Sequence, residues 1–165
     1  MRPATNYILS DDPTSQKLQL EQALRDLAQG VNGITLEYIP TIKGSTTKGT
    51  VTYSSQKGWY IRQSQMIDYW FNVSWTNWVG GVGNIRLNLP SKIWMSENDF
   101  FVGDLTTSNI AYANAADTNC VPVGINNSYQ CNFMSSGHNR TYGYVQVQTT
   151  GTLTGHIRYL GQLDK

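Results

Sequence analysis

The sequence predicts an all-β protein: an antiparallel, jelly-roll-like β-sandwich preceded by one short helix. Three observations carry this prediction. Apolar and polar residues alternate in several short runs, as in half-buried strands, and turn-forming glycine, asparagine and proline separate those runs. No alternation of strands with helical segments indicates a parallel sheet. Charged residues make up 14% of the chain and aromatic residues 12%, which excludes a charge-rich, aromatic-poor disordered chain.

The single helix is expected over about residues 13–29. Asp12 suits the N-cap, Pro13 suits the first helical position, and Gly30 suits the C-terminal end. Five apolar residues, within this helix and just after it, are spaced alternately by four and three, which is the pattern of a coiled-coil seam between chains. They are Leu20, Leu24, Leu27, Val31 and Ile34. Because the seam covers fewer than three heptads, an ordinary amphipathic helix packed on the strands is the alternative.

From Thr35 onward only strands and turns are expected, so the chain divides into residues 1–34, which hold the stalk helix, and a β-sandwich head domain over residues 35–165. Alternation is clearest over residues 67–75, where every second residue is apolar and faces the expected core: Ile67, Tyr69, Phe71, Val73 and Trp75. Trp70 points the other way, toward a possible subunit interface. The expected strands are 36–43, 49–55, 58–64, 66–76, 84–89, 99–103, 108–114, 120–125, 129–134, 142–150 and 152–160.

Charge and hydropathy exclude several partners. The formal net charge is +1 and no basic stripe runs along the chain, so nucleic-acid binding is not expected. No apolar stretch approaches the roughly 20 residues that cross a bilayer, so membrane insertion is not expected either. The first residues lack the apolar segment of a secretory signal, which leaves a mature product, a protein released by lysis and a fragment of a longer fibre as alternatives.

The two cysteines, Cys120 and Cys131, stand on either side of ten residues with turn formers at their middle. A hairpin there would bring the thiols face to face, so a disulfide and two separately buried thiols are equal alternatives. The cysteines and histidines lack the close pairwise spacing of metal ligands. Neither a metal nor a cofactor is therefore expected.

Residues 36–90 contain a series of short motifs in a fixed order. They are Tyr38, Pro40, Gly44, Val51–Ser54, Gln56, Gly58, Tyr60, Gly80–Gly81, Gly83–Asn84 and Leu89–Pro90. In order and spacing these motifs resemble the C-terminal head domains of phage tail fibres and of phage-derived trimeric bacterial adhesive fibres. Two positions depart from the family pattern. Trp59 stands where a basic residue is usual, which points to an altered face or interface, and Gln65 stands where glycine is common.

The resemblance implies a homotrimer with its heads on a threefold axis, in a virion tail fibre or at the cell surface of a bacterium. The expected function is that of a non-enzymatic receptor-binding, adhesive tip that recognises a cell-surface glycan or another envelope ligand. A glycan-degrading tail protein and a purely structural trimerisation or capping module are the alternatives.

Some tail proteins cleave glycans, and such cleavage requires catalytic groups. Hydrolysis of a glycosidic bond needs two carboxylates that face it, and Glu97 and Asp99 are the best pair close in sequence. A solvated acidic loop is the simpler interpretation of this pair. His138 and His156 lack a neighbouring nucleophile motif. No catalytic residue is therefore predicted, and the chain is expected not to be an enzyme.

The recognition surface is expected in residues 91–150, which contain none of the family motifs. If the strands run alternately away from and toward the stalk, the far loops are 44–48, 63–65, 90–98, 114–119 and 135–141. Aromatic rings stack on sugars, and polar or charged side chains bind their hydroxyls. The ligand-binding residues predicted from these loops are Lys92, Trp94, Asn114, Asp117, His138, Asn139 and Arg140.

Overall fold

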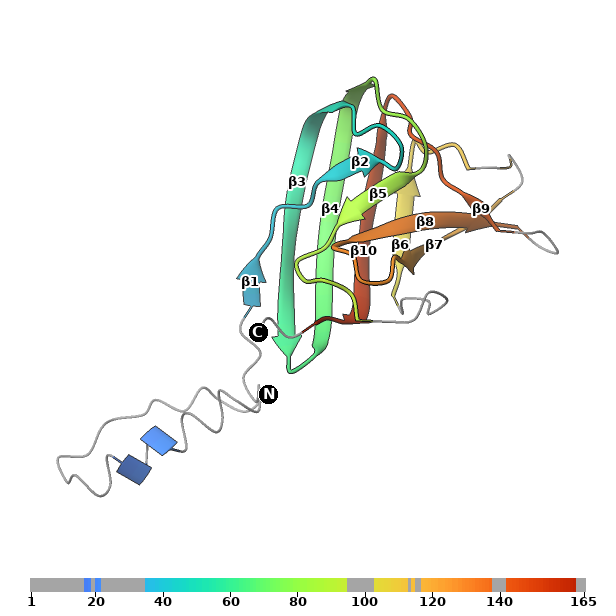
Figure 1. The fold of residues 1–165 in the computed structure, drawn as a ribbon. Coiled ribbons are helices and arrows are strands. Elements are labelled where there is room, and N and C mark those ends of the chain that lie inside the picture. The colour runs from blue at the N-terminus through green and yellow to red at the C-terminus, as the bar shows by residue number, and fades with distance from the viewer. Residues whose placement is uncertain are drawn as a thin grey trace.

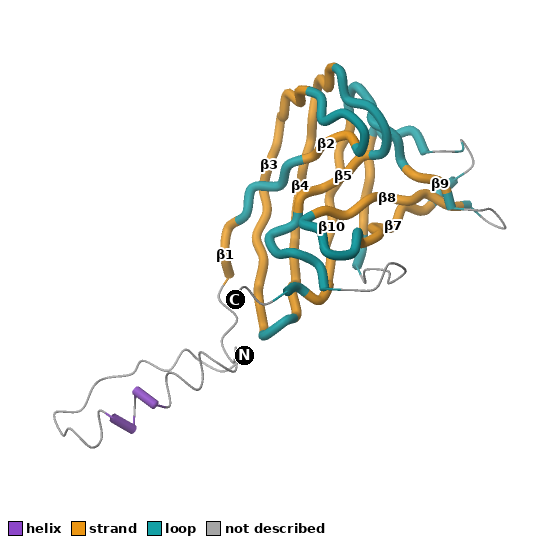
Figure 2. Tube along the Cα trace, viewed as in Figure 1, coloured by secondary structure: helices purple, strands orange, loops and turns teal. Residues whose placement is uncertain are grey.

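The computed structural model describes residues 17–18, 20–21, 35–94, 103–112, 114, 117–137 and 142–162. Within 35–162, the described elements are all β-strands, and every pairing between them is antiparallel (Figures 1 and 2). An all-β, antiparallel protein is therefore confirmed. In the described part of the chain no helix is long and apolar enough to cross a membrane.

The predicted stalk helix is described at four residues only. Residues 17–18 and 20–21 are helical, and Leu20 is 58% exposed. The remaining seam residues, Leu24, Leu27, Val31 and Ile34, lie outside the described residues. The coiled-coil seam and the trimer that it implies therefore stay predictions.

The strands form two five-stranded sheets. The first, called the long sheet here, has the order β1 (Thr35–Glu37), β3 (Thr50–Gln63), β4 (Met66–Val79), β10 (Gly151–Leu160) and β6 (Leu105–Ser108). The second, the short sheet, has the order β2 (Ile42–Gly44), β5 (Ile85–Asn88), β8 (Gln130–Ser136) and β7 (Asn119–Gly124), with β9 (Gly143–Tyr144) also paired to β8. In Figure 1 the short sheet crosses one face of the long sheet, the layering expected of a β-sandwich.

One buried cluster lies between the two sheets and draws on both. The alternating residues of β4 point into it as predicted, each at most 2% exposed: Ile67, Tyr69, Phe71, Val73 and Trp75. Ile157 from β10 joins them, and Leu87 and Phe133 face them from the short sheet. Full burial of one large apolar side chain contributes about 1.5–3 kcal/mol. The core therefore fixes which face of the long sheet points outward.

The segment predicted as one strand over residues 36–43 forms two strands in different sheets. The chain leaves the long sheet after β1 and enters the short sheet at β2, and buried Pro40 lies in the crossing. Proline has no N–H to donate to a ladder, so a continuous strand is disfavoured there. The prediction was wrong because alternation alone does not reveal a change of sheet.

The opposite error concerns β3, which was predicted as two strands, 49–55 and 58–64. It is one strand with a register shift between Thr52 and Ser55. Gly58, where the second strand was expected to begin, lies inside β3. A Cβ there would lie 2.6 Å from the Tyr38 carbonyl oxygen, so glycine permits the close approach of that segment. Counting two strands reverses the expected directions of the next two strands, 66–76 and 84–89.

Three further predicted strands differ from the structure. The strand predicted over residues 108–114 does not form; β6 lies a few residues earlier in the chain. Of the strand predicted over 142–150, only Gly143–Tyr144 forms. Trp78, expected in a loop, belongs to β4 and is 6% exposed. Residues 99–102 lie outside the described residues, and Gly103 is not in a strand.

Cys120 and Cys131 are free thiols. In the β7–β8 ladder, Cys120 lies opposite Ser135 and Cys131 lies opposite Gly124. The cysteines are thus offset by four positions, about 13 Å along the strand, whereas disulfides join Cα atoms less than about 7 Å apart. Burial raises the pKa of Cys120 to about 12 and also raises that of Cys131. The structure therefore has two separate thiols and not the disulfide, with Cys131 buried and Cys120 half-buried.

Candidate functional site

The outer face of the long sheet carries a row of three rings on neighbouring strands. Trp59 on β3 lies opposite Trp70 on β4, and Trp70 lies opposite His156 on β10. The Trp59 and Trp70 ring centroids are 6.4 Å apart with 12° between the planes, and those of Trp70 and His156 are 4.6 Å apart with 17°. The Trp70–His156 separation is close to the strand spacing of about 4.8 Å, and the wider Trp59–Trp70 separation lies within the roughly 4.5–7 Å of offset-stacked rings. Each ring therefore turns its flat face toward the next strand.

An ion-paired carboxylate holds the end of this row. Asp68, from β4, accepts hydrogen bonds from His156 Nε2 at 2.9 Å and from Arg158 Nε at 2.7 Å, and its second oxygen accepts from Arg158 Nη2 at 3.1 Å. Burial by itself would raise the pKa of Asp68, but the hydrogen bonds from Arg158 and His156 lower it below its ordinary value. Asp68 is thus a carboxylate at neutral pH and orients the imidazole of His156.

A pocket of about 540 Å³ opens beside the row, between β1 and β3. Its lining residues are Thr35, Glu37, Tyr38, Ile39, Gln56, Lys57, Gly58 and Trp59. One face of the Trp59 indole is covered by Trp70, so the other face is turned toward β1 and forms a wall of this pocket. Glu37 lies directly opposite Trp59 in the β1–β3 register. We call these lining residues the β1–β3 pocket.

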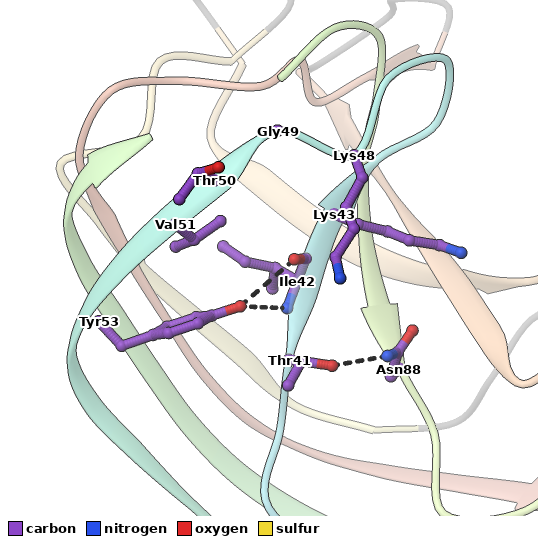
Figure 3. Close-up of a pocket in the computed structure, with 9 residues that line it drawn as sticks. All are labelled: Thr41, Ile42, Lys43, Lys48, Gly49, Thr50, Val51, Tyr53 and Asn88. Atoms are coloured by element: carbon purple, nitrogen blue, oxygen red, sulfur yellow. Dashed lines mark hydrogen bonds between the residues drawn. The ribbon is translucent and has the colours of Figure 1, made fainter. Parts of the chain in front are cut away.

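A second pocket, of about 340 Å³, lies near the start of β3 (Figure 3). The Ile42 amide donates to the Tyr53 hydroxyl at 2.9 Å, and that hydroxyl donates back to the Ile42 carbonyl at 3.3 Å. Asn88 Nδ2 donates to Thr41 Oγ1 at 2.6 Å. These polar groups bind one another, so the pocket leaves mainly Lys43 and Lys48 to meet a ligand.

Lys92 and Trp94 do not lie at the far end from β1, where the sequence predicted them. The Leu160 carbonyl accepts from the Trp94 amide, the Lys92 carbonyl accepts from the Gln162 amide, and the neighbouring Gly161 amide donates to Gln65. These contacts place both residues beside the β3–β4 turn, at the end of the long sheet where β1 begins (lower part of Figure 1). The placement was wrong because β3 is one strand and not two.

Asn114 and Asp117 lie in the segment between β6 and β7. Asp117 is 6% exposed and accepts a hydrogen bond from Ser135 Oγ at 2.7 Å, while the Asn114 carbonyl accepts from the Asp117 amide at 3.0 Å. Asp117 therefore braces this segment and is not displayed to a ligand. Asn114 is exposed.

The predicted ligand-binding residues that the structure describes do not lie together in the fold. The segment with Lys92 and Trp94 contacts Ser128, just before β8 begins, and the segment with Asp117 contacts Ser136, where β8 ends. The seven residues of β8 separate these contacts by about 20 Å. His138, Asn139 and Arg140, and the carboxylates Glu97 and Asp99, lie outside the described residues.

The pocket residues Trp59, Glu37 and Lys57 were missed by the sequence prediction. The sequence contained only part of the information needed to find this pocket. Alternation placed Trp70 on the outer face, and Trp59 departed from the tail-fibre pattern. What joins them is the pairing register of β1, β3 and β4. No local pattern specifies that register when strands of different sheets intervene.

No protein-family model matches the sequence, and no curated protein matches it. Among solved structures, the crystal structure of the Dettilon tailspike protein (gp208) is similar, with a TM-score of 0.53 and 17% sequence identity. The match covers 76% of this chain and 23% of the tailspike chain. The chain therefore shares a fold with part of a phage tailspike and spans less than a quarter of its length.

This likeness overturns one prediction. Tailspike proteins are often glycan-degrading enzymes, so the inference that this chain is not an enzyme is wrong as drawn from the sequence. The reasoning relied on missing local motifs, whereas hydrolytic carboxylates can be far apart in sequence and meet only in the fold. Catalysis has to be decided by an assay of glycan products.

Proposed function

We propose that this chain is part of a phage tail and engages a glycan of the bacterial cell envelope. The fold shared with part of a phage tailspike carries the proposal. In this reading residues 35–165 form a β-sandwich head, residues 1–34 join it to a fibre or spike, and three chains associate. Three sites on one rigid assembly would bind a repeating polymer with useful avidity.

The chemistry of the outer face supports a glycan over other envelope ligands. A sugar ring has an apolar C–H face that packs on an aromatic ring, and hydroxyls that need small polar partners. Next to the aromatic row the outer face has such groups in pairs: Asn72 Nδ2 donates to Thr154 Oγ1 at 2.7 Å, and Thr152 Oγ1 donates to Ser74 Oγ at 2.9 Å. Rigid rings beside hydroxyl and amide groups suit a neutral, polyhydroxylated polymer.

The proposal predicts that the full chain binds at least one purified envelope polysaccharide on an array of such polymers. Each polymer that is retained should then be incubated with the protein and its length distribution compared before and after. Retention without shortening indicates a receptor-binding protein, and retention with shortening indicates a glycan-degrading one. Both outcomes support glycan engagement.

The control is the mass of the protein in solution, measured on the same sample. A mass three times that of the 18.5 kDa monomer would identify a trimer. If that trimer bound no polysaccharide and no bacterial cell, the proposal would be overturned. The structural trimerisation module would then be the better account.

A further inference from the structure

We infer that the β1–β3 pocket binds one sugar ring of the envelope glycan, with the open face of Trp59 as its wall. The inference rests on the proposed glycan engagement and adds the place and the chemistry of the contact. Trp59 is 44% exposed, a large free surface for an aromatic side chain that is already stacked on one side.

The wall is rigid before any ligand arrives. Trp59 stacks on Trp70, Trp70 stacks on His156, and Asp68 holds the imidazole by a hydrogen bond of 2.9 Å. The indole therefore loses little freedom when a ring packs on it, and a preorganised surface binds more tightly than a mobile one.

The floor of the pocket is also fixed by backbone contacts. The Tyr38 amide donates to the Gly58 carbonyl at 3.0 Å, and Gln56 Nε2 donates to the Pro40 carbonyl at 2.9 Å. Because Gly58 has no side chain, the Tyr38–Pro40 segment lies directly against β3. The pocket therefore exists in the folded chain without rearrangement.

The polar groups of the pocket match the hydroxyls of a sugar. Glu37 lies opposite Trp59, and Lys57 lies two residues from it on the same face of β3, so a ring on the indole has an acceptor and a donor near its edge. The structure assigns neither side chain a hydrogen bond or an ion pair with any residue in the described ranges. A hydroxyl both donates and accepts, and can therefore satisfy the two groups together.

The charge balance favours a neutral ring over an ionic ligand. One carboxylate and one ammonium group line the pocket, so neither a phosphate nor a cationic ligand gains from a field of one sign. The pocket volume of about 540 Å³ falls within the roughly 300–1,000 Å³ of small-ligand sites. Apolar wall, fixed floor and opposed polar groups together specify a polyhydroxylated ring.

The test measures the affinity of the full chain for a polysaccharide retained on the array, for wild type and four variants. Trp59→Ala should weaken binding at least tenfold and Trp59→Tyr, which keeps a flat ring, by less than about threefold. Glu37→Gln keeps the shape but removes the charge, and should weaken binding about three- to tenfold. Tyr129→Ala removes another exposed aromatic side chain (51% exposed) outside the pocket and should leave affinity unchanged.

The outcomes separate the two proposals. If wild type binds and Trp59→Ala binds equally well, the pocket assignment is overturned while glycan engagement stands. If no polymer is bound by wild type, the proposed function itself fails. Thermal unfolding of each variant serves as the folding control. If Trp59→Ala unfolds, Glu37→Gln decides the case, because unchanged affinity in that variant would overturn the pocket assignment.

Discussion

Replacing Trp75 by alanine should lower the free energy of unfolding by about 3–5 kcal/mol. Trp75 is 2% exposed, its ring meets that of Trp78 edge-on with centroids 5.9 Å apart, and its Nε1 donates to the Gln148 carbonyl at 3.0 Å. Alanine removes the packing, leaves a cavity and leaves that carbonyl without its donor. Urea denaturation followed by circular dichroism measures the change. Since domains are typically stable by about 5–15 kcal/mol, the loss is a large share of the total.

The matched control is Trp59→Ala, on the opposite face of the same sheet. Its ring is 44% exposed, so its removal should cost about 1 kcal/mol or less. Equal losses for the two variants would contradict the assignment of inner and outer faces, on which the site also depends.

The protein should unfold cooperatively at alkaline pH, between roughly pH 10 and 12. Burial raises the pKa of Tyr69 and Tyr159 above the ordinary 10.0, and that of Cys120 from 9.0 to about 12; burial is also the main reason that the pKa of Cys131 is raised. A raised pKa means that the folded chain holds the proton more tightly than the unfolded chain does. The stability contributed by these groups is therefore complete below about pH 9 and is lost as the pH rises through the folded-state values.

The change in the free energy of unfolding per pH unit sets the pH range in which the protein should unfold. Each such group costs about 1.4 kcal/mol per pH unit once it is ionised in the unfolded chain, so four groups remove a domain's stability within one to three units. Tyrosinate absorbance and near-ultraviolet circular dichroism should change together at the midpoint. A gradual rise in tyrosinate with the fold intact at pH 12 would contradict this account.

The control for the alkaline transition is Tyr69→Phe. The buried Tyr69 hydroxyl has no hydrogen-bond partner among the described residues, and burial of an unpaired hydroxyl is unfavourable. The variant should be as stable as wild type at neutral pH, or more stable, and its alkaline midpoint should be higher because one titrating group is gone.

The strands that could be predicted are those with a solvent face and a buried face. In β4 every second residue meets the core, so the alternation of Ile67 to Trp75 specified both the strand and its orientation. The same pattern located β5 and β10 to within a residue or so. Alternation succeeds there because the burial of apolar side chains determines the structure of these segments directly.

The errors arose where a residue serves packing and not local geometry. Gly58 was expected to begin a second strand, but it lies inside β3 and allows the Tyr38–Pro40 segment to lie on that strand. The passage between sheets at Pro40 has no signature in the alternation. Because β3 was counted as two strands, the loop with Lys92 and Trp94 was expected at the opposite end of the long sheet from the one where it lies. The outer-face site needs pairing register across three strands, which depends on contacts distant in sequence.

The central claim is that the outer face of the long sheet, and not the loop with Lys92 and Trp94, meets the glycan. The chain has five tryptophans, and each gives one indole N–H signal in a two-dimensional nitrogen–proton spectrum. The signals should be followed during titration with oligosaccharide fragments of a polysaccharide retained on the array. The account predicts that Trp59 moves most, that its stacking partner Trp70 follows, and that buried Trp75 and Trp78 stay in place. Movement of Trp94 with Trp59 unchanged would contradict it.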